Sequence, residues 1–207
     1  IELGLVGSEM CIRDSISTGL KSNKFGVDAA SALTLYGHAA SSRTLYITGV
    51  DCHIGSQIAD DRPLLEALDS ILELVDSLED RGISLEHINL GGGFGVRYQD
   101  EVAMDLDAYG ARLQQRLGSR SNLLCVEPGR SLTANAGLLL TQVEYLKTAQ
   151  DGSKGFAVVD AAMNDLLRPS LYQAWHDVVV VNPPDKTALA QTWDIVGPIC
   201  ESSDFLA

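Results

Sequence analysis

The sequence predicts an α/β protein whose N-terminal part contains a parallel sheet. Segments typical of strands and of amphipathic helices alternate, and glycine or polar residues follow the strands. Parallel α/β folds bring such residues together at the carboxyl edge of the sheet. A (β/α)8 barrel and an open doubly wound sheet give the same alternation, so the order of elements leaves both open.

The elements follow from their residue patterns. Apolar residues recur at three-to-four spacing from Pro63 to Leu78, proline suits a first helical turn, and Gly82 suits the end, which together predict a helix. Other expected helices are at residues 29–40 and 106–117. Short apolar segments predict strands at residues 44–54, 85–90 and 123–126.

The pattern changes after Arg130. We expect strands at residues 138–147 and 156–160, joined by a turn at residues 151–155. The predicted domains are an α/β domain at residues 16–133 and a β-rich domain at residues 134–207. Residues 1–15 lack the basic start and long apolar stretch of a signal peptide, and we expect an unmatched, non-native leader there.

The composition excludes several kinds of partner. The chain has 28 acidic against 15 basic residues and a net charge of −13, which is unsuited to nucleic acid. No segment reaches the roughly 20 apolar residues that a membrane helix needs. The 4 cysteines are dispersed without a C-x-x-C pair, which favours free thiols in the cytoplasm over a metal site.

Polar or glycine motifs follow two of the predicted strands. His53 and Ser56 place an imidazole and a hydroxyl after the first of them. The second ends in Gly91, Gly92 and Gly93, where the missing Cβ atoms would let backbone N–H groups approach a phosphate. A tight turn explains the glycines equally well, and a lone histidine at a strand end is more often structural.

A third motif, at residues 127–130, follows the last strand of the α/β part. The Glu127 carboxylate can keep an aromatic ring nitrogen protonated, Gly129 allows close approach to a phosphate, and the Arg130 guanidinium can bind phosphate or carboxylate. A surface ion pair on a polar turn is the alternative interpretation of this motif.

Two further motifs lie in the β-rich part. Arg168 and Tyr172 are four residues apart and would share a helix face, with Pro169 suited only to the helix start. Cys200 is followed by Glu201, and a thiol beside a carboxylate can act as a proton donor, although such pairs are often incidental.

These motifs occur in the order found in a known family. Residues 16–207 resemble the fold-type III pyridoxal-phosphate-dependent decarboxylases, and the Cys-Glu pair within residues 197–204 is most similar to the branch that acts on diaminopimelate. The resemblance implies the C-terminal half of an alanine-racemase-like (β/α)8 barrel followed by the start of a β-rich domain. It also implies pyridoxal 5'-phosphate as cofactor, and decarboxylation of meso-2,6-diaminoheptanedioate (meso-diaminopimelate) to L-lysine by the intact enzyme.

The resemblance also implies roles for the motif residues. Cys200 would be the catalytic residue that returns a proton to the carbon that has lost CO₂. The implied cofactor-binding residues are His53, Ser56, Gly91, Gly92, Gly93, Glu127, Gly129 and Arg130. The implied substrate-binding residues are Arg130, Arg168, Tyr172 and Glu201. Because the Cys-Glu segment reaches the active site of the other subunit in this family, a homodimer with shared sites is implied.

The sequence departs from the family in two respects. The family lysine that attaches the cofactor lies in an early strand motif, which is not occupied by Lys21, Lys24, Lys147, Lys154 or Lys186. A late tyrosine would lie beyond Ala207, so we expect this chain alone to be inactive. Alternatives are a decarboxylase of ornithine, arginine or carboxynorspermidine, an alanine racemase, and a non-catalytic homologue that binds the cofactor.

Overall fold

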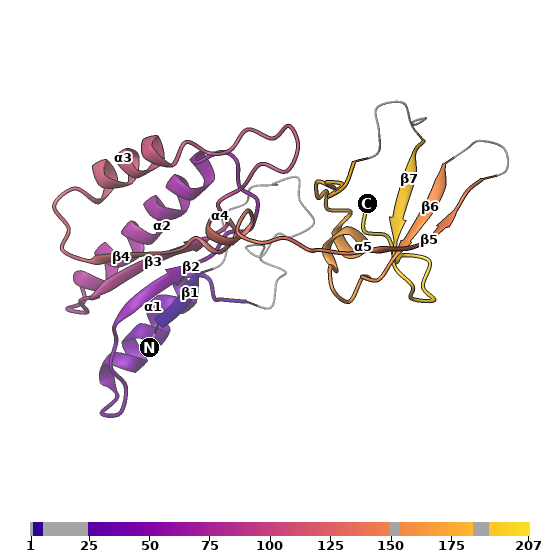
Figure 1. The fold of residues 1–207 in the computed structure, drawn as a ribbon. Coiled ribbons are helices and arrows are strands. Elements are labelled where there is room, and N and C mark those ends of the chain that lie inside the picture. The colour runs from indigo at the N-terminus through magenta and orange to yellow at the C-terminus, as the bar shows by residue number, and fades with distance from the viewer. Residues whose placement is uncertain (1, 6–24, 150–153, 184–190) are drawn as a thin grey trace. The chain divides into compact units, whose positions relative to one another are not determined.

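The computed structural model describes residues 2–5, 25–149, 154–183 and 191–207 (Figure 1). The chain divides into two compact units. Unit 1 extends to Ala136 without residues 98–100, and unit 2 consists of residues 98–100 and 137–207. The helices and strands of unit 1 confirm the predicted α/β class.

Unit 1 contains a parallel sheet in the order β1-β2-β3-β4. Its strands are β1 (Glu2–Leu5), β2 (Gly49–Cys52), β3 (His87–Gly92) and β4 (Leu123–Glu127). The three predicted strands are therefore present, but β2 begins at Gly49 rather than at residue 44. Strand β1 lies in the expected leader, and it pairs in parallel with β2 at one edge of the sheet.

The predicted helices of unit 1 are confirmed as α1 (Ala29–Ser41), α2 (Arg62–Glu79) and α3 (Leu106–Leu117). Helix α2 contacts α1 and α3 and packs on β2 and β3. Asp28 caps α1 by accepting a hydrogen bond from the Ser31 N–H at 2.9 Å. Among the described residues, no helix is long and apolar enough to cross a membrane.

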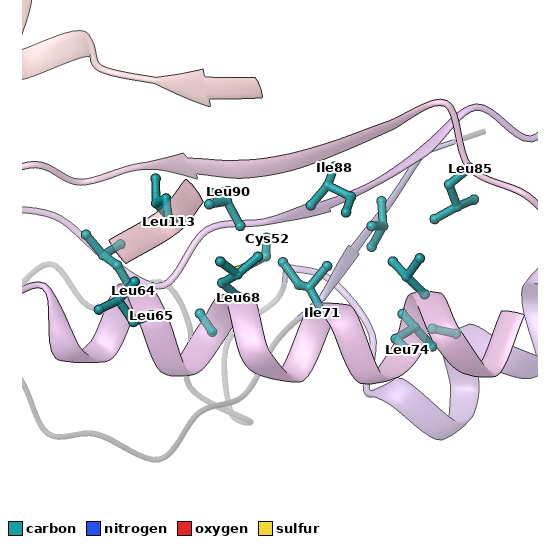
Figure 2. Close-up of a cluster of buried hydrophobic side chains, with 14 of the residues drawn as sticks. Cys52, Leu64, Leu65, Leu68, Ile71, Leu74, Leu85, Ile88, Leu90 and Leu113 are labelled. Carbon is teal, nitrogen blue, oxygen red and sulfur yellow. The ribbon is translucent and has the colours of Figure 1, made fainter. Parts of the chain in front are cut away.

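The core of unit 1 lies between helix α2 and the sheet (Figure 2). Leu68 and Ile71 of α2 are almost completely buried and face the strands that carry Ile88 and Leu90. Because side chains alternate along a strand, the residues between these apolar positions point to the opposite face of the sheet. That face therefore carries the polar residues of β2 and β3.

Unit 2 contains a sheet in the order β5-β6-β7. Its elements are β5 (Val143–Lys147), β6 (Gly155–Val159), the short helix α5 (Arg168–Tyr172) and β7 (Trp193–Val196). Strands β5 and β6 are antiparallel, and β6 and β7 are parallel. Part of the predicted turn, residues 151–153, lies outside the described residues.

The predicted long strand at residues 138–147 is wrong in its first part. Strand pairing begins only at Val143, opposite Val159. Asp160 directly follows β6, and its carboxylate accepts hydrogen bonds from the Gln142 N–H at 2.8 Å and from the Thr141 hydroxyl at 2.5 Å. One backbone hydrogen bond, from the Asp160 N–H to the Gln142 carbonyl at 3.1 Å, also joins the two segments there. Leu138 is completely exposed.

Candidate functional site

The parallel strands of unit 1 bring three of the predicted motifs to one edge of the sheet. His53 follows β2, Gly91 and Gly92 end β3, and Glu127 ends β4, where it is opposite Gly92 in the strand register. The Gly92 N–H donates a hydrogen bond to His53 Nδ1 at 3.3 Å. Nδ1 therefore acts as an acceptor, and the imidazole is fixed beside the glycine loop.

Close approach of the backbones explains the glycines at residues 91–93. A Cβ atom at Gly91 would lie 2.4 Å from the Cys52 carbonyl oxygen, and one at Gly93 would lie 2.2 Å from that of Gly55. Both residues have positive φ angles, +63° and +96°, which favour glycine. Close packing against the segment that follows β2 is therefore enough to require glycine at residues 91 and 93. Phosphate binding by this loop stays a prediction.

Asn89, which the sequence analysis missed, holds the Glu127 carboxylate. Its Nδ2 donates a hydrogen bond to Glu127 Oε1 at 2.8 Å, and its Oδ1 accepts one from the Gly91 N–H at 2.9 Å. The signal for Asn89 is a polar residue on the non-core face, two positions before the glycines and in register with Asp51. Its amide connects the carboxylate to the glycine loop.

Arg130 lies in the short helix α4 (Gly129–Thr133) and is held by a second residue that the sequence analysis missed. Its Nη1 donates a hydrogen bond to Gln57 Oε1 at 2.7 Å. In contrast to residues 91–93, a Cβ atom at Gly129 would meet no described atom within 4 Å. Ser56, beside Gln57, is half-buried.

In unit 2, Arg168 and Tyr172 lie on helix α5 with Pro169 in its first turn, as the spacing predicts. Arg168 Nη1 donates a hydrogen bond to the Tyr98 hydroxyl at 2.8 Å, and the guanidinium lies 5.2 Å from the centre of the Tyr98 ring. The ring of His176 packs against the same tyrosine. Burial, and then the charge of Arg168, lowers the pKa of His176.

Cys200 and Glu201 follow β7 and are exposed. Glu201 Oε1 accepts hydrogen bonds from the Ser203 N–H at 3.4 Å and from the Ser203 hydroxyl at 3.3 Å. The loop is closed by Asp204, a buried residue that the sequence analysis did not single out. The Asp204 carboxylate accepts hydrogen bonds from the Met163 N–H at 2.6 Å and the Ile199 N–H at 2.9 Å.

The polar groups at this edge of unit 1 suit an organic anion with a basic aromatic ring better than a metal ion. A carboxylate, a guanidinium, an imidazole and a loop of backbone N–H groups lie at one edge of the sheet. In the part of the chain that the structure describes, no group of three or more His, Cys, Asp or Glu side chains could hold a metal. This edge defines an α/β domain whose polar groups suit an anionic aromatic ligand.

A family comparison identifies the particular family. The model of the pyridoxal-binding domain of pyridoxal-dependent decarboxylases matches residues 7–134. The chain therefore belongs to the pyridoxal-dependent decarboxylase family. The match begins at residue 7 rather than at Ile16, within the segment expected to be an unmatched leader.

Three proteins of known function or structure illustrate the similarity. The diaminopimelate decarboxylase of Pseudomonas fluorescens is 56% identical over 192 residues, which are 93% of this chain and 45% of that protein. The crystal structure of the Helicobacter pylori diaminopimelate decarboxylase with L-lysine is 39% identical, with a TM-score of 0.89 over 100% of this chain and 51% of that one. A lysine/ornithine decarboxylase from Vibrio vulnificus, complexed with cadaverine, shares the fold at 22% identity, with a TM-score of 0.78 over 91% of this chain and 50% of that one. The chain thus spans about half the length of these relatives.

Proposed function

We propose that the intact protein containing this chain decarboxylates meso-diaminopimelate to L-lysine and CO₂ with pyridoxal 5'-phosphate as cofactor. The observation that carries the proposal is the edge formed by β2, β3 and β4, where Glu127, Arg130 and the glycine loop meet. The similarity to the Pseudomonas fluorescens enzyme supports the choice of substrate. The L-lysine in the Helicobacter pylori structure is the product of the proposed reaction.

The residues of unit 1 fit the cofactor chemically. When bound, pyridoxal phosphate supplies a protonated pyridine ring that takes up the electron pair released with CO₂. Glu127, oriented by Asn89, would hold the proton on the ring nitrogen, and His53 would lie against the ring. The phosphate would be bound by Ser56, Arg130 and the N–H groups of Gly93 and Gly129. Gly91 and Gly92 would shape the loop around it, because their own N–H groups donate to Asn89 and His53.

The residues of unit 2 would act on the substrate. Arg168 and Tyr172, with Arg130 of unit 1, would bind the substrate, and Glu201 would pair with its distal ammonium group. Cys200 would donate a proton from its thiol to the carbon that has lost CO₂. We further propose a homodimer in which each Cys200 and Glu201 serve the active site of the other subunit.

The proposal extends to the fold and the setting of the intact protein. Unit 1 would be part of a (β/α)8 barrel, residues 16–133 in our assignment, and unit 2 would be the start of a β-rich domain. The free thiols of Cys52, Cys125 and Cys200 support a cytoplasmic location. We do not expect Lys147 or Lys154, the two lysines among the described residues, to attach the cofactor. Both lie in unit 2, and Lys154 forms an ion pair with Asp194 at 2.6 Å.

The test compares substrates on the intact protein. The protein is purified with pyridoxal phosphate, and CO₂ release is measured from meso-diaminopimelate, ornithine, arginine and carboxynorspermidine. We expect a strong preference for diaminopimelate that Glu201→Ala abolishes. Glu144→Ala is the matched control, because Glu144 is an exposed carboxylate on β5 of the same unit.

Each other outcome favours a stated alternative. Release of CO₂ only from another amino acid would keep the fold and cofactor but replace the substrate. Racemisation of alanine in place of any decarboxylation would point to the racemase alternative. Cofactor binding without any turnover would favour the non-catalytic homologue.

A further inference from the structure

The side-chain amide of Gln57 joins three loops at the carboxyl edge of the sheet. Gln57 follows β2, and its Oε1 accepts hydrogen bonds from Arg130 Nη1 at 2.7 Å and from the Val96 N–H at 3.2 Å. Its Nε2 donates a hydrogen bond to the Val96 carbonyl oxygen. Val96 follows the glycine loop of β3, and Arg130 follows β4, so one amide fixes all three loops to one another.

The backbone of Gln57 is held in an unfavourable conformation. Its φ angle is +57°, in the left-handed region that residues with a Cβ atom rarely adopt. Hydrogen bonds of the next residue hold it there: the Ile58 N–H donates to the Gly93 carbonyl at 2.8 Å, and the Gly95 N–H donates to the Ile58 carbonyl at 2.9 Å. Strained residues fixed in this way cluster at functional sites.

A purely structural explanation accounts for the other such residue but not for Gln57. Among the described residues, the second non-glycine residue with positive φ is Gln173, at +52°. Gln173 ends helix α5, where a left-handed residue closes the helix and its N–H binds the Pro169 carbonyl at 2.9 Å. Gln57 ends no helix, and glycine would adopt its backbone conformation without strain. The presence of glutamine is explained by what its side chain holds.

We infer that Gln57 is a positioning residue that orients the Arg130 guanidinium toward an anionic oxygen group of the bound ligands. This inference rests on the proposed function, in which that group is the cofactor phosphate or the substrate carboxylate. A guanidinium has five N–H donors in a rigid planar fork, and the bond to Gln57 engages one donor at Nη1. The bond fixes the plane of the fork and leaves the other donors for the anion.

The experiment uses the intact protein and compares Gln57→Ala with Gln57→Gly. Both variants remove the bond to Arg130, but only glycine relieves the backbone strain, so Gln57→Gly should melt at a higher temperature than Gln57→Ala. We expect both variants to raise one constant by about tenfold, either the Kd for pyridoxal phosphate or the KM for the substrate. A tenfold change is typical of losing a hydrogen bond to a charged group. A raised Kd for pyridoxal phosphate in the apoprotein identifies the phosphate, and a raised KM with unchanged cofactor Kd identifies the substrate carboxylate.

A double-variant cycle with Arg130→Ala separates positioning from general damage. If Gln57 acts through Arg130, then Gln57→Ala should add little to the effect of Arg130→Ala. The inference would be overturned if the effects of Gln57→Ala and Arg130→Ala on Kd or KM were additive. It would also be overturned if binding were lost only in the Gln57 variant with the lower melting temperature. Unchanged Kd and KM in Arg130→Ala would overturn the proposed role of Arg130 and with it that of Gln57. An effect of Arg130→Ala without any effect of Gln57→Ala would overturn the inference alone.

Discussion

Replacing Asp204 tests how the loop that carries Cys200 and Glu201 is held. The buried carboxylate of Asp204 accepts hydrogen bonds from the backbone N–H groups of Met163 and Ile199, at 2.6 and 2.9 Å. Met163 lies between β6 and helix α5, and Ile199 directly precedes Cys200. The variant Asp204→Ala leaves both donors without this acceptor, whereas Asp204→Asn keeps one carbonyl oxygen and turns an NH₂ group toward the second donor.

The size of the effect follows from the burial of the two donors. A buried donor without a partner costs about 1–3 kcal/mol. Both hydrogen bonds of Asp204 are only partly buried, so water can replace the carboxylate in part. We therefore take the lower end of that range for each of the two donors and expect Asp204→Ala to lose about 2 kcal/mol of unfolding free energy. Asp204→Asn should lose about half as much, because one acceptor remains.

Tryptophan fluorescence measures this loss in the correct part of the chain. The chain has 2 tryptophans, Trp175 and Trp193, and both lie in unit 2. Urea unfolding followed by their emission gives the midpoint and the slope for this unit. Glu144→Ala, which removes an exposed carboxylate of the same unit, is the control. The reasoning is refuted if Asp204→Ala is no less stable than this control, or if Asp204→Asn is the less stable of the two Asp204 variants.

The remaining predictions concern unit 1 and the free thiols. Leu68→Ala should lower the unfolding free energy by about 2–5 kcal/mol because the side chain is completely buried, whereas Leu138→Ala should change it little; circular dichroism in urea checks this difference. Burial, and then the charge of Asp51, raises the pKa of Cys52 to about 12, so at pH 8 a thiol reagent should modify the exposed Cys200 but not Cys52. Because the Cys52 thiol ionises in the unfolded chain near its ordinary pKa of 9.0, the unfolding free energy should fall as the pH rises from there toward 12.

The sequence predicted best what depends on local periodicity. Helix α3 occupies the predicted residues 106–117, and α2 differs from its prediction by about one residue at its start, because apolar spacing and end signals act within a few turns. Helices α4 and α5 are too short for such a period to be visible, although the spacing of Arg168 and Tyr172 indicated a helical face. Strand β7 was missed because its pairing with β6 is set by a distant segment.

The contacts that hold the candidate site could not be predicted in the same way. The hydrogen bond from Asn89 to Glu127 joins residues 38 positions apart, and the bond from Arg130 to Gln57 joins residues 73 positions apart. Neither pair has a spacing that local structure would produce. The motif residues themselves were found by resemblance, and only the folded chain identifies the side chains that orient them.

One physical rule connects the core of unit 1 with its candidate site. Side chains alternate along β3, so placing Ile88 and Leu90 against helix α2 directs Asn89 to the other face of the sheet. Near the end of the strand, the Gly91 N–H donates a hydrogen bond to the Asn89 side chain, and the same side-chain amide holds Glu127. A shift of the strand register by one residue would move Asn89 into the core and free the Glu127 carboxylate. The packing of α2 on the sheet therefore fixes the orientation of the site, and substitutions in this core should affect the site through register as well as through stability.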